Sequence, residues 1–360
     1  MHAERKFAQR NGATQMEKNR LLEINIGMNP TRVELELTEQ CNLKCKFCYN
    51  SQNPLISDKI FDVIECLHEM GVLEIILTGG EPISHPLFLD ILDKCCKYFD
   101  KVMVQTNGTL IDAGMAKTLK NKGVYGVNVS LHGDKELHEK LTLVDGSYIQ
   151  AYEALEHLAS EGVNTASNFV LTTENISAFP KTIKKLHDIG VNGMTLTRFT
   201  PTGIGADNAY LSISTDQLVK VLEQADSFLE NCSNKSFYVL LANSVPYCAL
   251  PEHLKHYSEY CHFGASRFYI DINGNVLMCG MSRLQIGNIF NETFEEMKRK
   301  SKIYCNHVCG VDVPYYCKNC INFKKCRGGC RAAALACYNK IDGPDPYCKF
   351  KEVAKFETNK

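Results

Sequence analysis

Along residues 32–199, the spacing of apolar positions changes repeatedly between a period of two and a helical period. Six short apolar stretches are expected to be strands: Val33–Leu37, Leu73–Leu77, Lys101–Gln105, Gly126–Leu131, Thr165–Leu171 and Gly193–Arg198. Five stretches between them are expected to be helices: Asp58–Met70, Pro86–Tyr98, Asp112–Lys120, Ser147–Ser160 and Ala178–Ile189. This alternation predicts an α/β fold, with a parallel sheet that curves toward a barrel and helices on its outer face.

The last third of the chain shows a different pattern. Residues 214–231 predict a helix with Ser214 or Thr215 as its N-cap, and Ser236–Leu241 predicts another strand. Phe268–Cys279 predicts a β-hairpin with Asn273-Gly274 as a two-residue turn. We therefore expect a tail or cap over residues 1–30, a barrel over residues 31–235 and a small cysteine-rich domain over residues 236–360.

The composition of the chain limits both its class of function and its cellular compartment. The 360 residues carry a net charge of −1 and no long basic run, which gives no support to a role on nucleic acid or at a membrane surface. No apolar run reaches the roughly 18 residues that span a bilayer, and the N-terminus lacks the apolar core of a signal peptide. We expect a cytoplasmic protein. In a reducing compartment, its 18 cysteines indicate metal binding rather than disulfides.

Three of these cysteines, Cys41, Cys45 and Cys48, follow the first predicted strand with the spacing C-x3-C-x2-C. Sulfur ligands suit an iron–sulfur cluster or zinc, but a structural zinc site needs four ligands. Three thiolates can hold a cluster and leave one iron open to an external ligand. The alternative is three buried apolar thiols, but the polar and charged residues between them make a poor core segment.

The second predicted strand runs into a second motif, Thr78-Gly79-Gly80-Glu81-Pro82. A cysteine triplet with Phe47 before its last cysteine, followed by GGEP after a strand, resembles the radical SAM superfamily. The resemblance implies a partial (β/α)6 TIM-like barrel. It also implies a 4Fe–4S cluster on the triplet and S-adenosylmethionine (SAM) on the open iron, where reductive cleavage yields a 5′-deoxyadenosyl radical. The residues of the GGEP motif would bind the methionine end of SAM, and Phe47 would lie near the adenine. Glycine suits such a motif because it allows close approach to the backbone.

In barrels of this kind the chemistry lies at the carboxyl ends of the strands, where the motifs fall. Ser130 ends the fourth strand and matches a family position that contacts SAM; a serine that caps a turn is the alternative. His132 is expected to be a turn residue. Arg198 ends the sixth strand and could pair with the SAM carboxylate, or form a surface ion pair. Thr142 departs from the family, because an arginine often contacts SAM at that position.

Seven further cysteines and a glycine form an ordered array. Cys261 is followed by twelve residues, Gly274, four residues and Cys279; then come Cys317-x2-Cys320-x5-Cys326-x3-Cys330 and finally Cys348. This array resembles the SPASM domain, which implies two auxiliary 4Fe–4S clusters and three clusters in all. A zinc ribbon would explain only the C-x2-C pair.

The SPASM resemblance implies an outer set of ligands, Cys317, Cys320, Cys326 and Cys348, and an inner set, Cys261, Cys279 and Cys330. Cys248 is the expected fourth inner ligand. Cys305 and Cys309 are alternatives to it, and an inner cluster with an open iron is a further alternative. The remaining cysteines are expected to be structural: Cys66, Cys95, Cys96, Cys232 and Cys337.

The resemblance implies an enzyme that abstracts hydrogen from a residue of a ribosomally made peptide or protein. The product would be a thioether, a crosslink, an epimerised residue or an oxidised side chain. One alternative is a formylglycine-generating, sulfatase-maturing enzyme, which would carry an aspartate where this chain has Gly280. The others are a small-molecule-modifying radical SAM enzyme and a non-catalytic iron–sulfur electron carrier. Expected partners are an electron donor such as flavodoxin or ferredoxin and a separate leader-peptide-binding protein.

Overall fold

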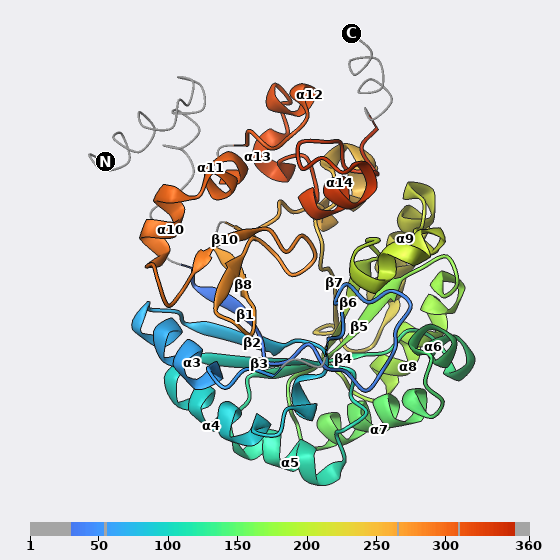
Figure 1. Ribbon diagram of the computed structural model, residues 1–360. Coiled ribbons are helices and arrows are strands. Elements are labelled where there is room, and N and C mark those ends of the chain that lie inside the picture. Colours follow the sequence, from blue (N-terminus) through green and yellow to red (C-terminus); the bar gives the residue numbers. More distant parts are fainter. Residues whose placement is uncertain (1–29, 54–55, 265, 309, 350–360) are drawn as a thin grey trace.

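The computed structural model describes residues 30–53, 56–264, 266–308 and 310–349 (Figure 1). The predicted tail or cap, except Pro30, lies outside these ranges, as does Cys309. Among the residues that the structure describes, none of the helices combines the length and apolarity needed to cross a bilayer.

A single sheet organises the molecule, in the order β10-β9-β8-β1-β2-β3-β4-β5-β6-β7. Its strands are β1 (Arg32–Glu36), β2 (Glu74–Thr78), β3 (Lys101–Thr106), β4 (Gly126–Ser130), β5 (Thr165–Leu171), β6 (Gly193–Arg198), β7 (Tyr238–Leu241), β8 (Arg267–Ile270), β9 (Asn275–Leu277) and β10 (Gln285–Asn288). From β8 to β7 every neighbouring pair is parallel, and only β9 and β10 run antiparallel to their neighbours.

The six predicted barrel strands and the five predicted helices between them are all confirmed. The helices of this part are α3 (Ile60–Glu69), α4 (Phe88–Tyr98), α5 (Ala113–Asn121), α6 (Lys135–Thr142), α7 (Ser147–Ser160), α8 (Phe179–Asp188) and α9 (Thr215–Asn231). The sequence reasoning missed α6, a short polar helix whose N-cap Asp134 accepts a hydrogen bond from the Leu137 N–H. For α9, the N-cap is Ser214, which forms a capping box with Gln217.

Alternating residues of β1 separate the two faces of the sheet. Val33 and Leu35 are fully buried in the main core, which also contains apolar residues of helices α3, α4, α5, α7, α8 and α9. Glu34 and Glu36 point to the opposite face because successive strand residues alternate sides. In Figure 1, the helices from α3 to α8 form an arc along the outer side of the curved sheet. The inner face is therefore the barrel interior, and it carries polar side chains.

The cysteine-rich segment is joined to this sheet on both edges. β7 pairs with β6, and β8 pairs with β1, so the sheet continues across the boundary expected at residue 235. The remaining helices are α10 (Phe294–Lys300), α11 (Lys302–Val308), α12 (Tyr315–Lys318), α13 (Phe323–Cys326) and α14 (Arg331–Tyr338). Figure 1 shows them across the sheet from the outer helices.

The predicted hairpin forms between β8 and β9, but its turn differs from the expected one. The Gly274 N–H donates to the Asp271 carbonyl at 3.0 Å, which centres the turn on Ile272 and Asn273. Gly274 follows with a φ of 75°, the left-handed conformation that suits a glycine after a type I turn. The predicted two-residue turn at Asn273-Gly274 is therefore wrong, because the turn lies one residue earlier in the chain.

Candidate active site and auxiliary cysteine sets

The loop that carries Cys41, Cys45 and Cys48 leaves the carboxyl end of β1 and is held by backbone hydrogen bonds. The Lys44 and Lys46 N–H groups donate to the carbonyls of Thr142 and Leu141 at the end of α6, at 3.1 and 2.9 Å. The helix that sequence reasoning missed thus supports the cysteine loop. Thr142 is buried, and its hydroxyl lies 2.8 Å from that of Ser147.

The three thiols of this loop lie close enough to act on one another electrostatically. Burial, with the charges of Glu81 and Cys48 among the smaller contributions, raises the pKa of Cys41 to about 11. Burial, then the charges of Cys48 and Cys41, raises the pKa of Cys45 well above its usual value. Buried thiolates are unfavourable without a nearby cation. A soft-donor set of this kind fits an iron–sulfur cluster, whose irons would supply the positive charge.

The glycines of the GGEP motif pack against the cysteine loop. The Gly80 N–H donates to the Thr38 carbonyl at 2.6 Å, and the Glu81 N–H donates to the Gln40 carbonyl at 2.8 Å. A Cβ on Gly80 would lie 2.1 Å from the Gln40 oxygen, and one on Gly79 would lie 2.3 Å from the Thr38 oxygen. These glycines are therefore required for contact between the two loops of the site, whatever they also contribute to a ligand.

Glu81 connects this motif to the end of β3. Its fully buried carboxylate accepts hydrogen bonds from the Ile83 N–H at 3.1 Å, the Thr106 hydroxyl at 2.7 Å and the Asn107 N–H at 2.8 Å. The Asn107 amide in turn donates to the Asn42 side chain at 2.8 Å, next to Cys41. Burial raises the pKa of Glu81 to about 7, against the opposing effect of its three donors.

The other predicted SAM-contact residues lie around the same strand ends. Thr78 and Pro82 are buried, and Ser130 is half-buried at the end of β4. Phe47 packs edge-on to His132, with ring centroids 4.6 Å apart, beside a small apolar cluster. His132 is buried and its Nδ1 accepts a hydrogen bond from the Val170 N–H at 3.2 Å, which gives it a structural role.

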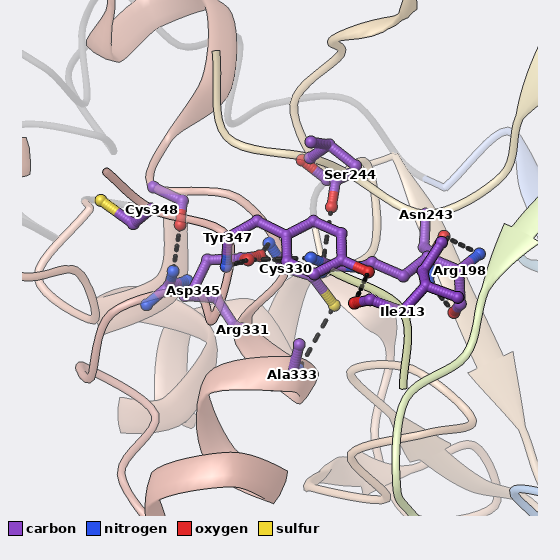
Figure 2. Close-up of polar contacts among 12 residues, drawn as sticks. Arg198, Ile213, Asn243, Ser244, Cys330, Arg331, Ala333, Asp345, Tyr347 and Cys348 are labelled. Carbon is purple, nitrogen blue, oxygen red and sulfur yellow. Dashed lines mark hydrogen bonds and ion pairs between the residues drawn. The ribbon is translucent and has the colours of Figure 1, made fainter. Parts of the chain in front are cut away.

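Arg198 does not reach this group, which corrects its expected SAM contact. Its guanidinium forms a two-pronged ion pair with Asp345, at 2.8 and 2.9 Å, and the two residues are 2% and 0% exposed (Figure 2). The Asp345 carboxylate also accepts the Cys330 N–H at 2.8 Å, and the Asp345 carbonyl accepts the Cys348 N–H at 2.8 Å. Arg198 therefore anchors the two loops that carry Cys330 and Cys348 to the end of β6.

The cysteines of the expected inner set act on one another electrostatically. Burial, then the charges of Cys330 and Cys279, raises the pKa of Cys261 to about 12. Burial is also the main cause that raises the pKa of Cys279 to about 11, and the charge of Cys330 adds to it. Cys279 and Cys330 pack with the small residues Ala332 and Ala333. These three thiols suit a second cluster.

Cys248 does not join that set, which contradicts its expected role as the fourth inner ligand. Its Sγ lies 3.9 Å from the Sγ of Cys348, a member of the outer set. Cys305 is directed elsewhere too, because its thiol donates to the Lys298 carbonyl at 3.4 Å. A hydrogen bond with Cys348, then burial, raises the pKa of Cys248, and the charge of Cys326 adds to it. A hydrogen bond with Cys348, then burial, also raises the pKa of Cys317, and the charge of Cys326 adds to it.

A polar group in the barrel interior was missed by sequence reasoning. The buried Glu36 carboxylate accepts hydrogen bonds from the Asn50 amide at 2.9 Å and the Arg283 guanidinium at 3.2 Å. Burial and then the nearby Glu34 carboxylate raise the pKa of Tyr49, whose ring adjoins Tyr269 across Gly280. The alternation of residues in β1 could have indicated this group from the sequence. It places Glu34 and Glu36 on the face opposite to the buried Val33 and Leu35.

Comparison with known proteins defines the class. The family model of the radical SAM superfamily matches residues 35–186, which cover β1 to α8 and include the cysteine loop and the GGEP motif. The chain therefore carries a radical SAM domain over these residues.

Its relatives have more than one function. The chain is 24% identical over 339 residues to the AdoMet-dependent heme synthase of Oleidesulfovibrio alaskensis, covering 89% of this chain and 87% of the relative. It is 25% identical over 320 residues to the subtilosin biosynthesis protein AlbA of Bacillus subtilis, covering 85% and 68%. The fold is similar to that of SuiB from Streptococcus suis bound to SAM, with a TM-score of 0.73, 18% identity, and coverage of 92% and 80%.

Proposed function

We propose that this radical SAM enzyme abstracts hydrogen from a residue of a ribosomally made peptide or protein and carries two auxiliary 4Fe–4S clusters. The observation that supports this most strongly is the arrangement of thiols. One set of three lies on the loop held by Gly80 and Glu81. In a second set, the charges of Cys330 and Cys279 act on Cys261. An electron carrier needs no SAM site, so the clamped GGEP motif argues against that alternative.

The residues of the chain have distinct roles in this proposal. Cys41, Cys45 and Cys48 would hold the cluster that, when loaded, supplies the electron for SAM cleavage. The Glu81 carboxylate fixes the relative position of the GGEP motif and the Asn107 loop. Phe47, between His132 and the apolar cluster, offers a ring surface for the adenine, and Ser130 offers a hydroxyl at the next strand end.

The barrel interior is suited to hold a polar substrate group. Glu34 projects from the middle of β1 into this space, between the neighbouring strands β2 and β8. Burial raises the pKa of Glu34, while the charges of Arg267 and Arg32 oppose the shift. Tyr49 and Tyr269 provide aromatic surface in the same region. A peptide side chain with a hydrogen-bond donor matches this lining.

Two observations favour a peptide over the other substrates. AlbA is a bacteriocin biosynthesis protein, and SuiB has also been crystallised with its precursor peptide SuiA. Formylglycine formation is disfavoured, because a Cβ on Gly280 would lie 2.8 Å from the Tyr269 ring and leave no space for an aspartate. The heme synthase relative supports a second candidate, the modification of a tetrapyrrole or another small molecule.

The central test is reductive cleavage of SAM. Anaerobically reconstituted, reduced protein should contain roughly 12 irons per chain, at four per cluster, and should convert SAM to 5′-deoxyadenosine. The triple variant Cys41→Ala/Cys45→Ala/Cys48→Ala should keep roughly eight irons and form no 5′-deoxyadenosine. Cleavage by the triple variant, or roughly four irons in the wild type, would disprove the proposal.

Substrate class needs a separate experiment. Candidate precursor peptides from neighbouring reading frames should change mass when incubated with SAM, a reductant and the enzyme. A flavodoxin or ferredoxin should replace the chemical reductant, and a leader-peptide-binding protein should increase the yield. Heme formation from a tetrapyrrole, with no change in any peptide, would favour the second candidate.

A further inference from the structure

A cavity of about 380 Å³ lies where the end of β6, the start of α9 and helix α14 meet. Its volume falls within the range of roughly 300–1,000 Å³ that is usual for small-molecule sites. Its walls also include the segment that ends at Tyr347. Within the described ranges, no residue of the cysteine loop or of the GGEP motif lines it. The cavity is therefore separate from the residues that were assigned to SAM.

Two buried polar side chains of this cavity have an atom with no hydrogen-bond partner. Thr200 is 5% exposed and Arg198 is 2% exposed, and both line the cavity. Among the described residues, neither the Thr200 hydroxyl nor the Arg198 Nε has a partner. Asp345 binds the other two guanidinium nitrogens and leaves Nε–H as a donor. Buried polar groups are normally paired, so both atoms point to a ligand that carries acceptors.

The amino-terminal end of α9, a helix of 17 residues, adds donors to the same cavity. The capping box engages the N–H groups of Ser214 and Gln217, at 2.8 and 3.2 Å. The N–H groups of Thr215 and Asp216 are then the donors left at this helix end in the part of the chain that the structure describes. A helix amino terminus favours an anion, because its N–H groups and its dipole both point positive charge outward.

The rest of the lining is mainly apolar. Phe199 and Ile213 are buried, and the Tyr347 ring covers the Arg198 guanidinium, with 4.4 Å between its centroid and Cζ. The Tyr347 hydroxyl donates to the Ile213 carbonyl at 2.8 Å, which fixes the ring (Figure 2). These walls suit a ligand that joins an acceptor group to an apolar body.

The charges around the cavity limit how negative the ligand can be. The charge of Arg198 is balanced by Asp345 in their buried pair. Asp216 lines the cavity and is exposed, so it places a negative charge near the helix end. A doubly charged phosphate would be repelled there, whereas a carboxylate carries one charge and accepts several hydrogen bonds.

We propose that this cavity binds a carboxylate on an apolar body. The carboxylate accepts hydrogen bonds from the Thr200 hydroxyl, the Arg198 Nε–H and the free N–H groups of α9, and the apolar body packs on Phe199 and Tyr347. The ligand is either a free carboxylic acid or the carboxyl terminus of a peptide. This site does not depend on the function proposed above, because it uses neither SAM nor a cluster.

The test is anaerobic isothermal titration of the full, cluster-loaded chain with N-acetyl-L-leucine and with its carboxamide. We expect the acid to bind at least about tenfold more tightly, since a hydrogen bond to a charged group is worth that much. The same pair of titrations with N-acetyl-alanyl-alanyl-leucine distinguishes the two sources. Tight binding of the tripeptide acid alone indicates a peptide terminus, and equal binding of both acids indicates a free acid. Equal affinity of each acid and its amide would overturn the proposal.

Variants locate the carboxylate. Thr200→Val should weaken binding of the acid at least about tenfold and Thr200→Ser should retain it. The matched control is Thr182→Val, whose buried hydroxyl donates to the Ala178 carbonyl at 3.0 Å within α8, and it should bind as wild type. Asp216→Asn should strengthen binding roughly two- to fivefold by removing a like charge. An unchanged Thr200→Val or a weakened Asp216→Asn would each refute the assignment, and the second result applies even if Thr200→Val does not fold.

Cys337 offers an independent readout of position, because it lines the cavity and is exposed. Saturating N-acetyl-L-leucine should slow alkylation of Cys337 by iodoacetamide, measured by peptide mass spectrometry. Cys66, partly exposed on α3, is the internal reference and should react at an unchanged rate. Protection of both thiols, or of neither, would show that the acid binds elsewhere.

Discussion

Replacing Arg198 with methionine should destabilise the protein strongly and leave SAM binding intact. Methionine fills a similar volume but leaves the Asp345 carboxylate buried without its cation. Removing one partner of a buried ion pair typically costs about 3–5 kcal/mol. Asp345 would keep hydrogen bonds from the Cys330 and Tyr347 N–H groups, at 2.8 and 2.9 Å, so we expect the low end, about 3 kcal/mol.

The measurement is urea unfolding of the cluster-loaded protein under anaerobic conditions. Far-UV circular dichroism and cluster absorbance must give coincident transitions before a free energy of unfolding is derived. Arg32→Met is the matched control, because the Arg32–Glu74 pair is partly exposed and should contribute about 1 kcal/mol or less. Adding Asp345→Asn to Arg198→Met should recover part of the loss, since no charge is then stranded.

Two results would refute this reasoning. Equal destabilisation by Arg198→Met and Arg32→Met would mean that the buried pair has no special role. A tenfold or larger loss of SAM affinity in Arg198→Met, without a change in stability, would restore the SAM contact expected from the sequence. Isothermal titration with SAM separates these cases, because the ion pair with Asp345 should make Arg198 irrelevant to SAM.

Two further predictions concern the GGEP motif. Gly80→Ala should cost about 3 kcal/mol by forcing its Cβ against the Gln40 backbone, and reconstitution should yield about four fewer irons; Gly114→Ala, whose nearest neighbour would be 3.3 Å away, should change neither. The raised pKa of Glu81 stabilises the folded state most below the unfolded value near 4.5, and this contribution disappears as the pH rises through about 7. Relative to wild type, Glu81→Gln should therefore gain about 2.5 kcal/mol between pH 5 and 8 in urea unfolding, and a pH-independent difference would contradict the assignment.

The barrel could be predicted from the sequence because its strands and helices have local signals. Each buried strand is a short apolar run, and most helices have an amphipathic period that can be recognised from the sequence alone. The exception, α6, is only eight residues long and mostly polar, so its pattern is weak. Its stability depends on its N-cap and on the neighbouring α7, which a local window does not contain.

The cysteine sets were only partly predictable, for a physical reason. Spacing along the chain brings Cys41, Cys45 and Cys48 together, because they share one loop. Which set Cys248 joins depends on how the segment after β7 packs against the end of the chain, and no local pattern encodes that contact. The partner of Arg198 is likewise 147 residues away, so its guanidinium could be assigned only from the tertiary structure.

The pairing of β8 with β1 has a consequence for the order of folding. β1, the strand that precedes the cysteine loop, has one neighbour, β2, that follows soon in the chain, and another, β8, that begins only at Arg267. Arg283, which closes onto Glu36 from that late segment, is 247 residues away. During synthesis, one edge of β1 stays open until most of the chain has left the ribosome. The scaffold of the first cysteine loop is thus completed only after β8 and Arg283 have been synthesised, which ties its maturation to that of the carboxyl-terminal segment.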